Sequence, residues 1–167
     1  MGKAGMRNAA ALIAIGFMVS VAGAATVSDF NFQWEGYGSG TLNPPDGLHI
    51  DGPGGPGLQE SEGYFTGTAP LAGLLTFDFL YESEDYADGA FYRVNGGDRQ
   101  MFVNQSGSVT GDISVMLEAG DTFDLGVWSV DSLYDQGHLT VTNFSQVPEP
   151  SALVLLAIGA CTVARRR

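Results

Sequence analysis

Hydrophobic and polar residues alternate with a period of two along several short stretches in the middle of the chain. Such alternation is typical of β-strands that bury one face. The stretches lie at 30–37, 75–81, 112–117, 122–130 and 138–144. No stretch between the two ends of the chain has a convincing helical period of 3.6 residues. Strands at this spacing, separated by Gly and Asp turns, predict an all-β fold, an antiparallel β-sandwich.

Two further strands are predicted at 90–94 and 100–103, on either side of Asn95-Gly96. This dipeptide favours the positive φ values of a tight hairpin turn, so we expect these strands to pair.

In the predicted strand that begins at Thr122, the alternation of residues predicts which side chains enter the core. Phe123, Leu125 and Val127 share one face, whereas Trp128 has the opposite parity. We therefore expect Trp128 to face outward.

Residues 43–63 are rich in Gly and Pro and begin NPPDGLHIDGPGGPG. We predict an irregular loop or an edge excursion there and assign no strand to it. His49 in this loop and His138 at a strand start are far apart in sequence, and no Cys/His spacing of a zinc site is present. Both histidines are therefore interpreted as incidental.

The N-terminal end has the pattern of a secretory signal peptide. Lys3 and Arg7 precede an apolar run, and Ala22-Gly23-Ala24 follows at a spacing that a signal peptidase accepts. We predict a signal helix over residues 1–25 and an exported domain over 26–147. The alternative is an N-terminal membrane anchor.

The exported segment is strongly acidic. It contains 18 of the 19 Asp and Glu and only 2 of the 7 Lys and Arg, namely Arg93 and Arg99, so its charge is −16. Such a domain repels phosphate backbones, so no nucleic-acid partner is expected. It attracts cations instead. The one cysteine, Cys161, lies outside this segment, so the exported domain contains no disulfide.

The C-terminal twenty residues read PEPSALVLLAIGACTVARRR. Two prolines make the start stiff and extended. The uncharged run at 151–164 predicts a transmembrane helix, although it is shorter than the about 20 residues that span a bilayer comfortably. The final arginines favour the cytoplasmic side. The membrane-retention residues are Arg165, Arg166 and Arg167.

These three parts, in this order at the C-terminus, resemble the PEP-CTERM sorting signal. Its signature residues here are Pro148, Glu149 and Pro150. The resemblance implies processing by an exosortase, a membrane transpeptidase-like cysteine enzyme of bacteria that make exopolysaccharide. The chain would then be substrate and cargo, held in the membrane by the helix of the sorting tail, residues 148–167, only before processing. A plain single-span anchor is the alternative.

The segment before the tail resembles the β-sandwich cargo domain common among PEP-CTERM proteins. The resemblance rests on TFDFLYESED, FYRVNG, LEAGDTFDLGVWSVDS and HLTVTNF, between Gly67 and Val147. It implies a jelly-roll-like fold and brings no catalytic residues.

The densest cluster of charge is the acidic loop, residues 82–88. Closely spaced carboxylates suit Ca²⁺, which takes about six to eight oxygen ligands, although no EF-hand pattern is present. The candidate calcium ligands are Glu84, Asp85 and Asp88, with Asp131 and Asp135 from a second loop. The alternative is a solvated acidic loop without a metal, and no other cofactor is expected.

Aromatic side chains offer faces for stacking on sugars, or they fill the core of the sandwich. They are Trp34, Tyr37, Tyr81, Tyr86, Tyr92, Trp128 and Tyr134. No nucleophile motif such as G-x-S-x-G is present. The sequence therefore predicts a non-enzymatic exported protein at the cell surface or in the exopolysaccharide matrix. The alternative is a carbohydrate-binding module, with or without calcium.

Overall fold

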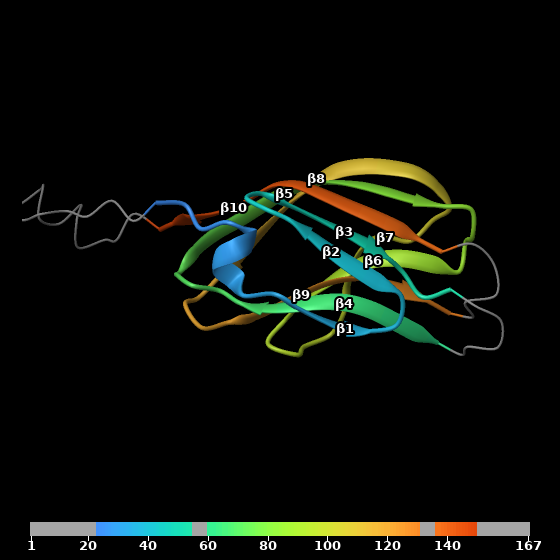
Figure 1. Cartoon of the computed structure of the whole chain (residues 1–167), viewed down its shortest axis with the longest axis horizontal. Helices are drawn as coiled ribbons and strands as arrows, with labels where there is room; N and C mark the ends of the chain where they lie inside the picture. The colour runs from blue at the N-terminus through green and yellow to red at the C-terminus, as the bar shows by residue number, and fades with distance from the viewer. Residues whose placement is uncertain (1–22, 55–59, 131–135, 150–167) are drawn as a thin grey trace, which may run out of the picture.

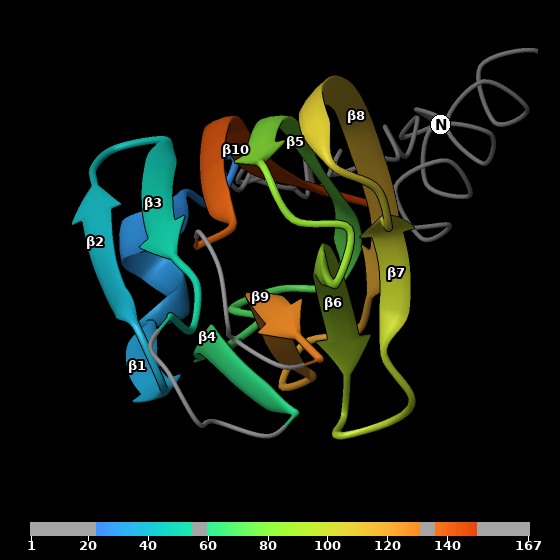
Figure 2. The same cartoon turned by 90° about the vertical axis from the view of Figure 1, so that its right-hand side faces the viewer.

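The fold consists of two five-stranded antiparallel sheets packed face to face (Figures 1 and 2). The computed structural model describes residues 23–54, 60–130 and 136–149. Its elements are the 3-10 helix η1 (Val27–Phe30) and the strands β1 (Gln33–Gly36), β2 (Ser39–Asn43), β3 (Gly47–Asp51), β4 (Ser61–Thr68), β5 (Gly73–Ser83), β6 (Asp88–Val94), β7 (Gln100–Val103), β8 (Gly107–Leu117), β9 (Thr122–Ser129) and β10 (His138–Pro148).

The strand order is that of a jelly roll. One sheet runs β2-β3-β10-β5-β8 and the other β1-β4-β9-β6-β7. The pairs β3–β10, β4–β9, β5–β8 and β6–β7 are nested within one another, as in a long hairpin rolled into two layers. Strands β2 and β1 extend one edge of each sheet. The predicted jelly-roll-like sandwich is therefore confirmed.

The innermost pair of this rolled hairpin is the one predicted from Asn95-Gly96. Strands β6 and β7 pair on either side of this turn. Asn95 has a φ of 54° and Gly96 a φ of 64°, as a turn with two left-handed central residues requires.

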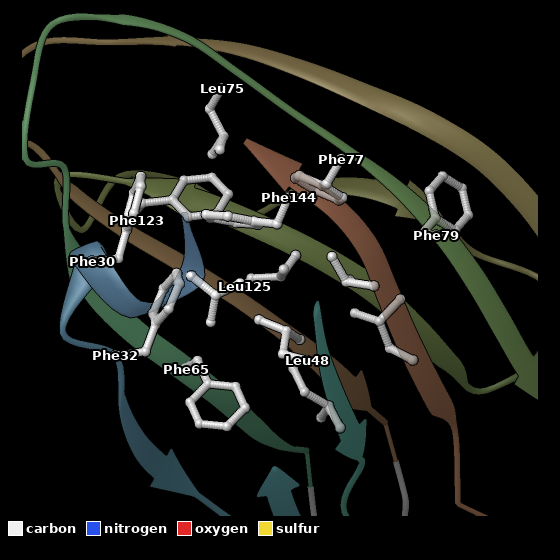
Figure 3. Packing of buried hydrophobic residues seen from close by; sticks show 14 of the residues in the cluster. Phe30, Phe32, Leu48, Phe65, Leu75, Phe77, Phe79, Phe123, Leu125 and Phe144 are labelled. Atoms are coloured by element: carbon white, nitrogen blue, oxygen red, sulfur yellow. The ribbon is translucent and has the colours of Figure 1, made fainter. Parts of the chain in front are cut away.

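The core lies between the sheets and contains a cluster of phenylalanine rings (Figure 3). Phe123, Leu125 and Val127 on β9 are fully buried, and Trp128 lies on the opposite face of this strand. Both orientations agree with the predicted parity. On β5, alternate side chains from Leu75 to Tyr81 point inward in the same way.

The interpretation of residues 43–63 as an irregular loop or edge excursion without a strand is wrong. Strand β3 lies inside this segment, and Leu48 and Ile50 are fully buried between the sheets. Strand β4 begins at its end, at Ser61. The five residues of β3 are too few to stand out among Gly and Pro, and they are held in place by pairing with β10, about ninety positions further along the chain.

The strand expected over 30–37 is also different in the structure. Phe30 ends the 3-10 helix η1, and Asn31 takes a left-handed φ of 52° before β1 begins at Gln33. The spacing of Phe30 and Phe32 resembled a strand, but both rings enter the core through this turn, where they stack at a centroid distance of 5.3 Å.

Strand β10 contains a bulge that changes which side chains face inward. The pairing with β5 shifts in register between Thr142 and Ser145, where Asn143 has a φ of 54°. Before the bulge Val141 points inward, and after it Phe144 does, although the two are three residues apart.

The first described residues of the chain pair with the last strand, β10. Ala25 and Gln146 exchange two backbone hydrogen bonds of 2.9 and 2.8 Å. The predicted signal helix and C-terminal transmembrane helix lie outside the described residues. Within residues 23–54, 60–130 and 136–149, no helix is long and apolar enough to cross a bilayer.

Candidate functional site

Two histidines and one aspartate meet on the outer face of the β2-β3-β10-β5-β8 sheet. His49 and Asp51 are on β3 and His138 begins β10. Asp51 Oδ1 lies 3.0 Å from His49 Nε2 and 2.7 Å from His138 Nδ1. We name His49, Asp51 and His138 the His-Asp-His cluster. The sequence interpretation set both histidines aside as incidental, whereas the fold brings them together.

Two hydroxyl groups support this cluster from the neighbouring strands. Thr140 Oγ1 lies 2.9 Å from His49 Nδ1, and the Ser39 hydroxyl donates to Asp51 Oδ2 over 3.0 Å. Partial burial raises the pKa of Asp51, but hydrogen bonds from His138, Ser39 and His49 outweigh it and hold this pKa below its usual value. The carboxylate is therefore kept in its charged form.

The geometry of the cluster follows from the register of the strands. Asp51 lies directly opposite Ser39 on β2 and opposite His138 on β10. His49, two residues before Asp51, lies opposite Thr140. Side chains two residues apart on a strand share a face, so all five point outward from the same sheet.

The predicted calcium ligands of the acidic loop have mixed surroundings. Asp88 is 1% exposed and accepts a hydrogen bond of 3.2 Å from the Ser83 hydroxyl. Asp85 Oδ1 accepts the Ala87 N–H over 3.0 Å, so both carboxylates shape the loop. Glu84 is exposed. The other two predicted ligands, Asp131 and Asp135, lie outside the described residues.

One carboxylate oxygen of the acidic loop, Asp85 Oδ2, is buried without a hydrogen-bond partner among the described residues. Burial raises the pKa of the nearby Tyr81 hydroxyl far above its usual value, and the charge of Asp88 adds to this effect. These contacts do not test whether calcium binds, so the calcium site stays a prediction.

A second polar cluster lies on the outer face of the β1-β4-β9-β6-β7 sheet. Arg93 donates to Glu62 over 2.9 Å and to Asp124 over 3.0 Å. Arg99 forms an ion pair with Glu60, whose carboxylate also accepts the indole N–H of Trp128 over 3.0 Å.

These residues enclose a shallow hollow. We name it the Arg-Trp hollow, and it is lined by Glu60, Ser61, Glu62, Arg93, Arg99 and Trp128. It contains both arginines of the segment 26–147. Their guanidinium groups lie over aromatic rings, Arg99 at 4.9 Å from Trp128 and Arg93 at 4.5 Å from Tyr64. Such cation–π contacts hold the arginines against the sheet.

The ion pairs also set the charge states in this hollow. Burial acts against the charge of Arg93, but Glu62 and Asp124 raise the pKa of Arg93 above its usual value. Hydrogen bonds from Arg99 and Trp128 lower the pKa of Glu60. The hollow therefore presents fixed charges of both signs beside an aromatic ring.

The other aromatic candidates are divided between core and surface. Tyr81 is fully buried, and Trp34 and Tyr92 pack against core phenylalanines. Tyr37 and Tyr86 are 56% and 81% exposed, on separate segments. Tyr134 lies outside the described residues. Trp128 is therefore the candidate that combines an outward position with charged neighbours.

The predicted sorting signature begins within the last strand. Pro148 is the final residue of β10 and lies opposite Gly73. The Glu149 N–H donates to the Ala72 carbonyl over 3.3 Å. The signature therefore begins at the end of the central strand of its sheet, without a spacer. Pro150 and the three terminal arginines lie outside the described residues.

Residues 146–167 match the family model of the PEP-CTERM protein-sorting motif. The chain carries a PEP-CTERM sorting motif. This motif indicates a secreted protein that is held at the membrane for sorting, and it implies an exosortase as the sorting partner. No curated protein matches the chain in sequence.

Several solved structures resemble the sandwich. The secreted serine protease VesC from Vibrio cholerae aligns at 19% identity with a TM-score of 0.49, over 65% of this chain and 22% of that one. A family 35 carbohydrate-binding module from an environmental isolate aligns at 14% identity with a TM-score of 0.43, over 76% and 98% of the two chains. TmCBM61 in complex with β-1,4-galactotriose aligns at 12% identity with a TM-score of 0.42, over 71% and 88%.

The His-Asp-His cluster is a part of the surface that the sequence interpretation missed. The alternation of Leu48 and Ile50 with His49 and Asp51 was a usable signal for a strand with a polar outer face. It identifies two of the three residues. His138 joins them only through the pairing of β3 with β10, which no local pattern predicts.

Proposed function

We propose that this protein is a non-catalytic cargo that an exosortase sorts, through the PEP-CTERM motif, to the cell surface or the exopolysaccharide matrix. The match of residues 146–167 to the sorting motif carries this proposal. The position of the motif supports it, because Pro148 ends the last strand of the sandwich. Processing would then occur at the edge of a folded domain.

The surface beside the motif carries exposed apolar side chains, which suit a domain that is held at a membrane before processing. Val147, Leu74 and Met116 lie side by side across β10, β5 and β8, and they are 53%, 40% and 54% exposed. With Pro148 and Glu149 they line one shallow hollow. Exposed apolar side chains of this kind commonly mark contact with a membrane or a partner.

The test is mass spectrometry of the mature protein from cells that produce it. We expect the wild-type protein to lack the residues that follow the motif. We expect the Glu149→Gln variant to keep the fold, because Glu149 is exposed and bonds to the sandwich through its backbone N–H. We expect this variant to retain its tail, whereas the exposed control Glu118→Gln is processed normally. A wild-type protein with its tail still attached would refute the sorting proposal.

Carbohydrate binding is the second candidate function, and the Arg-Trp hollow favours it. Sugar rings stack on aromatic faces, and charged groups beside the ring bond to hydroxyls. Trp128 supplies the ring, and Glu60 and Arg99 lie beside it.

This candidate is tested by tryptophan fluorescence and affinity electrophoresis of the full chain with neutral and acidic exopolysaccharides. We expect retarded migration and a fluorescence change in the wild type, and neither in Trp128→Ala. Trp34→Phe is the control, because Trp34 packs on the core residue Phe65 and is not one of the residues that line the hollow. Unretarded migration of the wild type in every gel would exclude this function and leave the sorting proposal intact.

A further inference from the structure

The His-Asp-His cluster brings three potential metal ligands to one point on a sheet. One potential ligand atom from each of His49, Asp51 and His138 lies within 4.8 Å of the other two. We propose that His49, Asp51 and His138 bind one divalent transition-metal ion of the zinc type.

The distances are close to those of a metal site. With zinc–ligand distances of about 2.0 Å, two ligands of one tetrahedral ion lie about 3.3 Å apart. Asp51 Oδ1 is already 3.0 Å from one ring nitrogen and 2.7 Å from the other. Small rotations of the imidazole and carboxylate groups therefore make room for the ion, without a change of the backbone.

Two neighbouring hydroxyl groups fix the orientation of the His49 ring and the Asp51 carboxylate. In metal sites a histidine usually donates its second ring N–H to an oxygen, which fixes the ring and its tautomer. Thr140 Oγ1 is placed to accept this proton from His49 Nδ1, which leaves the Nε2 lone pair directed at the ion. The Ser39 hydroxyl holds the other oxygen of Asp51 in the same manner.

The sheet itself makes the site rigid. Two ligands are on β3 and the third is on β10, and the paired backbones of these strands fix the spacing of their side chains. Ligands that stand on strands lose less conformational freedom on binding an ion than ligands on a loop do. The cluster is therefore preorganised.

The surroundings attract cations and leave the ion accessible. Glu82 lies directly opposite His138 on β5, and together with Glu84 it lines a shallow hollow beside this histidine. Their negative charge raises the local concentration of cations. The three ligand side chains are each about one third exposed, so the ion keeps open positions for water or for an oxygen group of a partner.

The ligand types decide which ion the cluster prefers. Imidazole nitrogens suit zinc, nickel and copper, whereas calcium and magnesium take oxygen ligands. The proposed site therefore differs from the predicted calcium site of the acidic loop in its ligands and in its chemistry.

The experiment is calorimetric titration of the full chain with zinc chloride after treatment with a chelator. We expect one zinc ion per chain. His49→Gln and His138→Gln should each weaken zinc binding by at least about tenfold, and Thr140→Val by about tenfold through loss of the supporting oxygen. The control is Asp112→Asn, an exposed carboxylate on β8 of the same sheet, which should bind zinc as the wild type does.

Cobalt provides an independent readout, because the visible absorption of Co²⁺ is sensitive to nitrogen ligands and to a low coordination number. We expect an absorption band with the wild type that is absent from the His49→Gln and His138→Gln variants, whose fold is checked by circular dichroism. Absence of zinc uptake by the wild type would overturn the proposal. Zinc uptake by both histidine variants equal to that of the wild type would also overturn it, because the zinc would then be bound by scattered surface carboxylates. A third contradicting result would be calcium binding by the wild type that both histidine variants lose, because the cluster would then prefer calcium.

Discussion

Replacement of Phe144 by alanine should destabilise the sandwich more than most single substitutions. Phe144 is 1% exposed and lies just after the bulge of β10. Its ring stacks on Phe77 at 6.1 Å and meets Phe30 and Phe32 edge-on at 5.1 and 5.7 Å (Figure 3). The substitution would leave a cavity at a point where both sheets and η1 meet.

The magnitude follows from this environment. A buried Phe→Ala substitution costs about 3–5 kcal/mol, and each favourable ring pair contributes about 0.5–1.5 kcal/mol beyond its buried area. Three such pairs are lost here, so we expect a cost near the upper limit, about 4–5 kcal/mol. A domain of this size loses roughly 4 °C of melting temperature per kcal/mol, so the expected fall is about 15–20 °C.

Urea and thermal unfolding of the full chain, followed by circular dichroism, measure this cost. Tyr86→Ala is the control, because its ring is 81% exposed and its loss should change the free energy of unfolding by no more than about 0.5 kcal/mol. A loss below about 2 kcal/mol in Phe144→Ala would show that the bulge does not place this ring in the core.

Three further predictions concern a turn, a close backbone contact and the acidic loop. Hydrogen bonds from the Asn95 amide and the Glu118 N–H lower the pKa of Asp121. The pKa of Asp121 is therefore lower in the folded than in the unfolded state, so its charged form stabilises the fold and Asp121→Asn should lower the melting temperature at pH 7. The difference in melting temperature between this variant and the wild type should disappear as the pH falls below about 4, where Asp121 becomes protonated. A Cβ atom on Gly63 would lie 1.9 Å from the Tyr37 carbonyl oxygen, so Gly63→Ala should cost about 1–3 kcal/mol in urea unfolding, and an unchanged midpoint would contradict this packing. Millimolar calcium should raise the melting temperature if the acidic loop binds it, and an unchanged melting temperature would exclude the calcium site.

The sequence predicted those strands whose local pattern is strong. The alternation around Phe77 and Leu125 and the turn at Asn95 each depend on neighbours in sequence, and the structure has them as expected. The jelly-roll-like fold was implied by the resemblance to a cargo domain, and the order of the strands was not predicted. It depends on nested long-range pairing, which local periodicity does not encode.

The elements that sequence reasoning missed are those that other strands hold in place. Strand β3 is only five residues long and is bordered by Gly and Pro, and it forms because β2 and β10 pair with it on both sides. The His-Asp-His cluster shares this origin, since two of its residues are on β3. The bulge at Asn143 is similar, because the need to bury Phe144 favours a left-handed residue there over regular alternation.

Strand β10 connects the proposed metal site with the sorting motif. His138 begins this strand and Pro148 ends it. At about 3.3 Å per residue the strand places the two about 30 Å apart, at opposite ends of the sandwich. If the tail holds the chain at a membrane before processing, the exposed apolar side chains beside Pro148 face the bilayer, and the cluster at the far end faces away from it. Metal binding and sorting are then independent, so the histidine variants should be processed normally and the Glu149→Gln variant should still bind zinc.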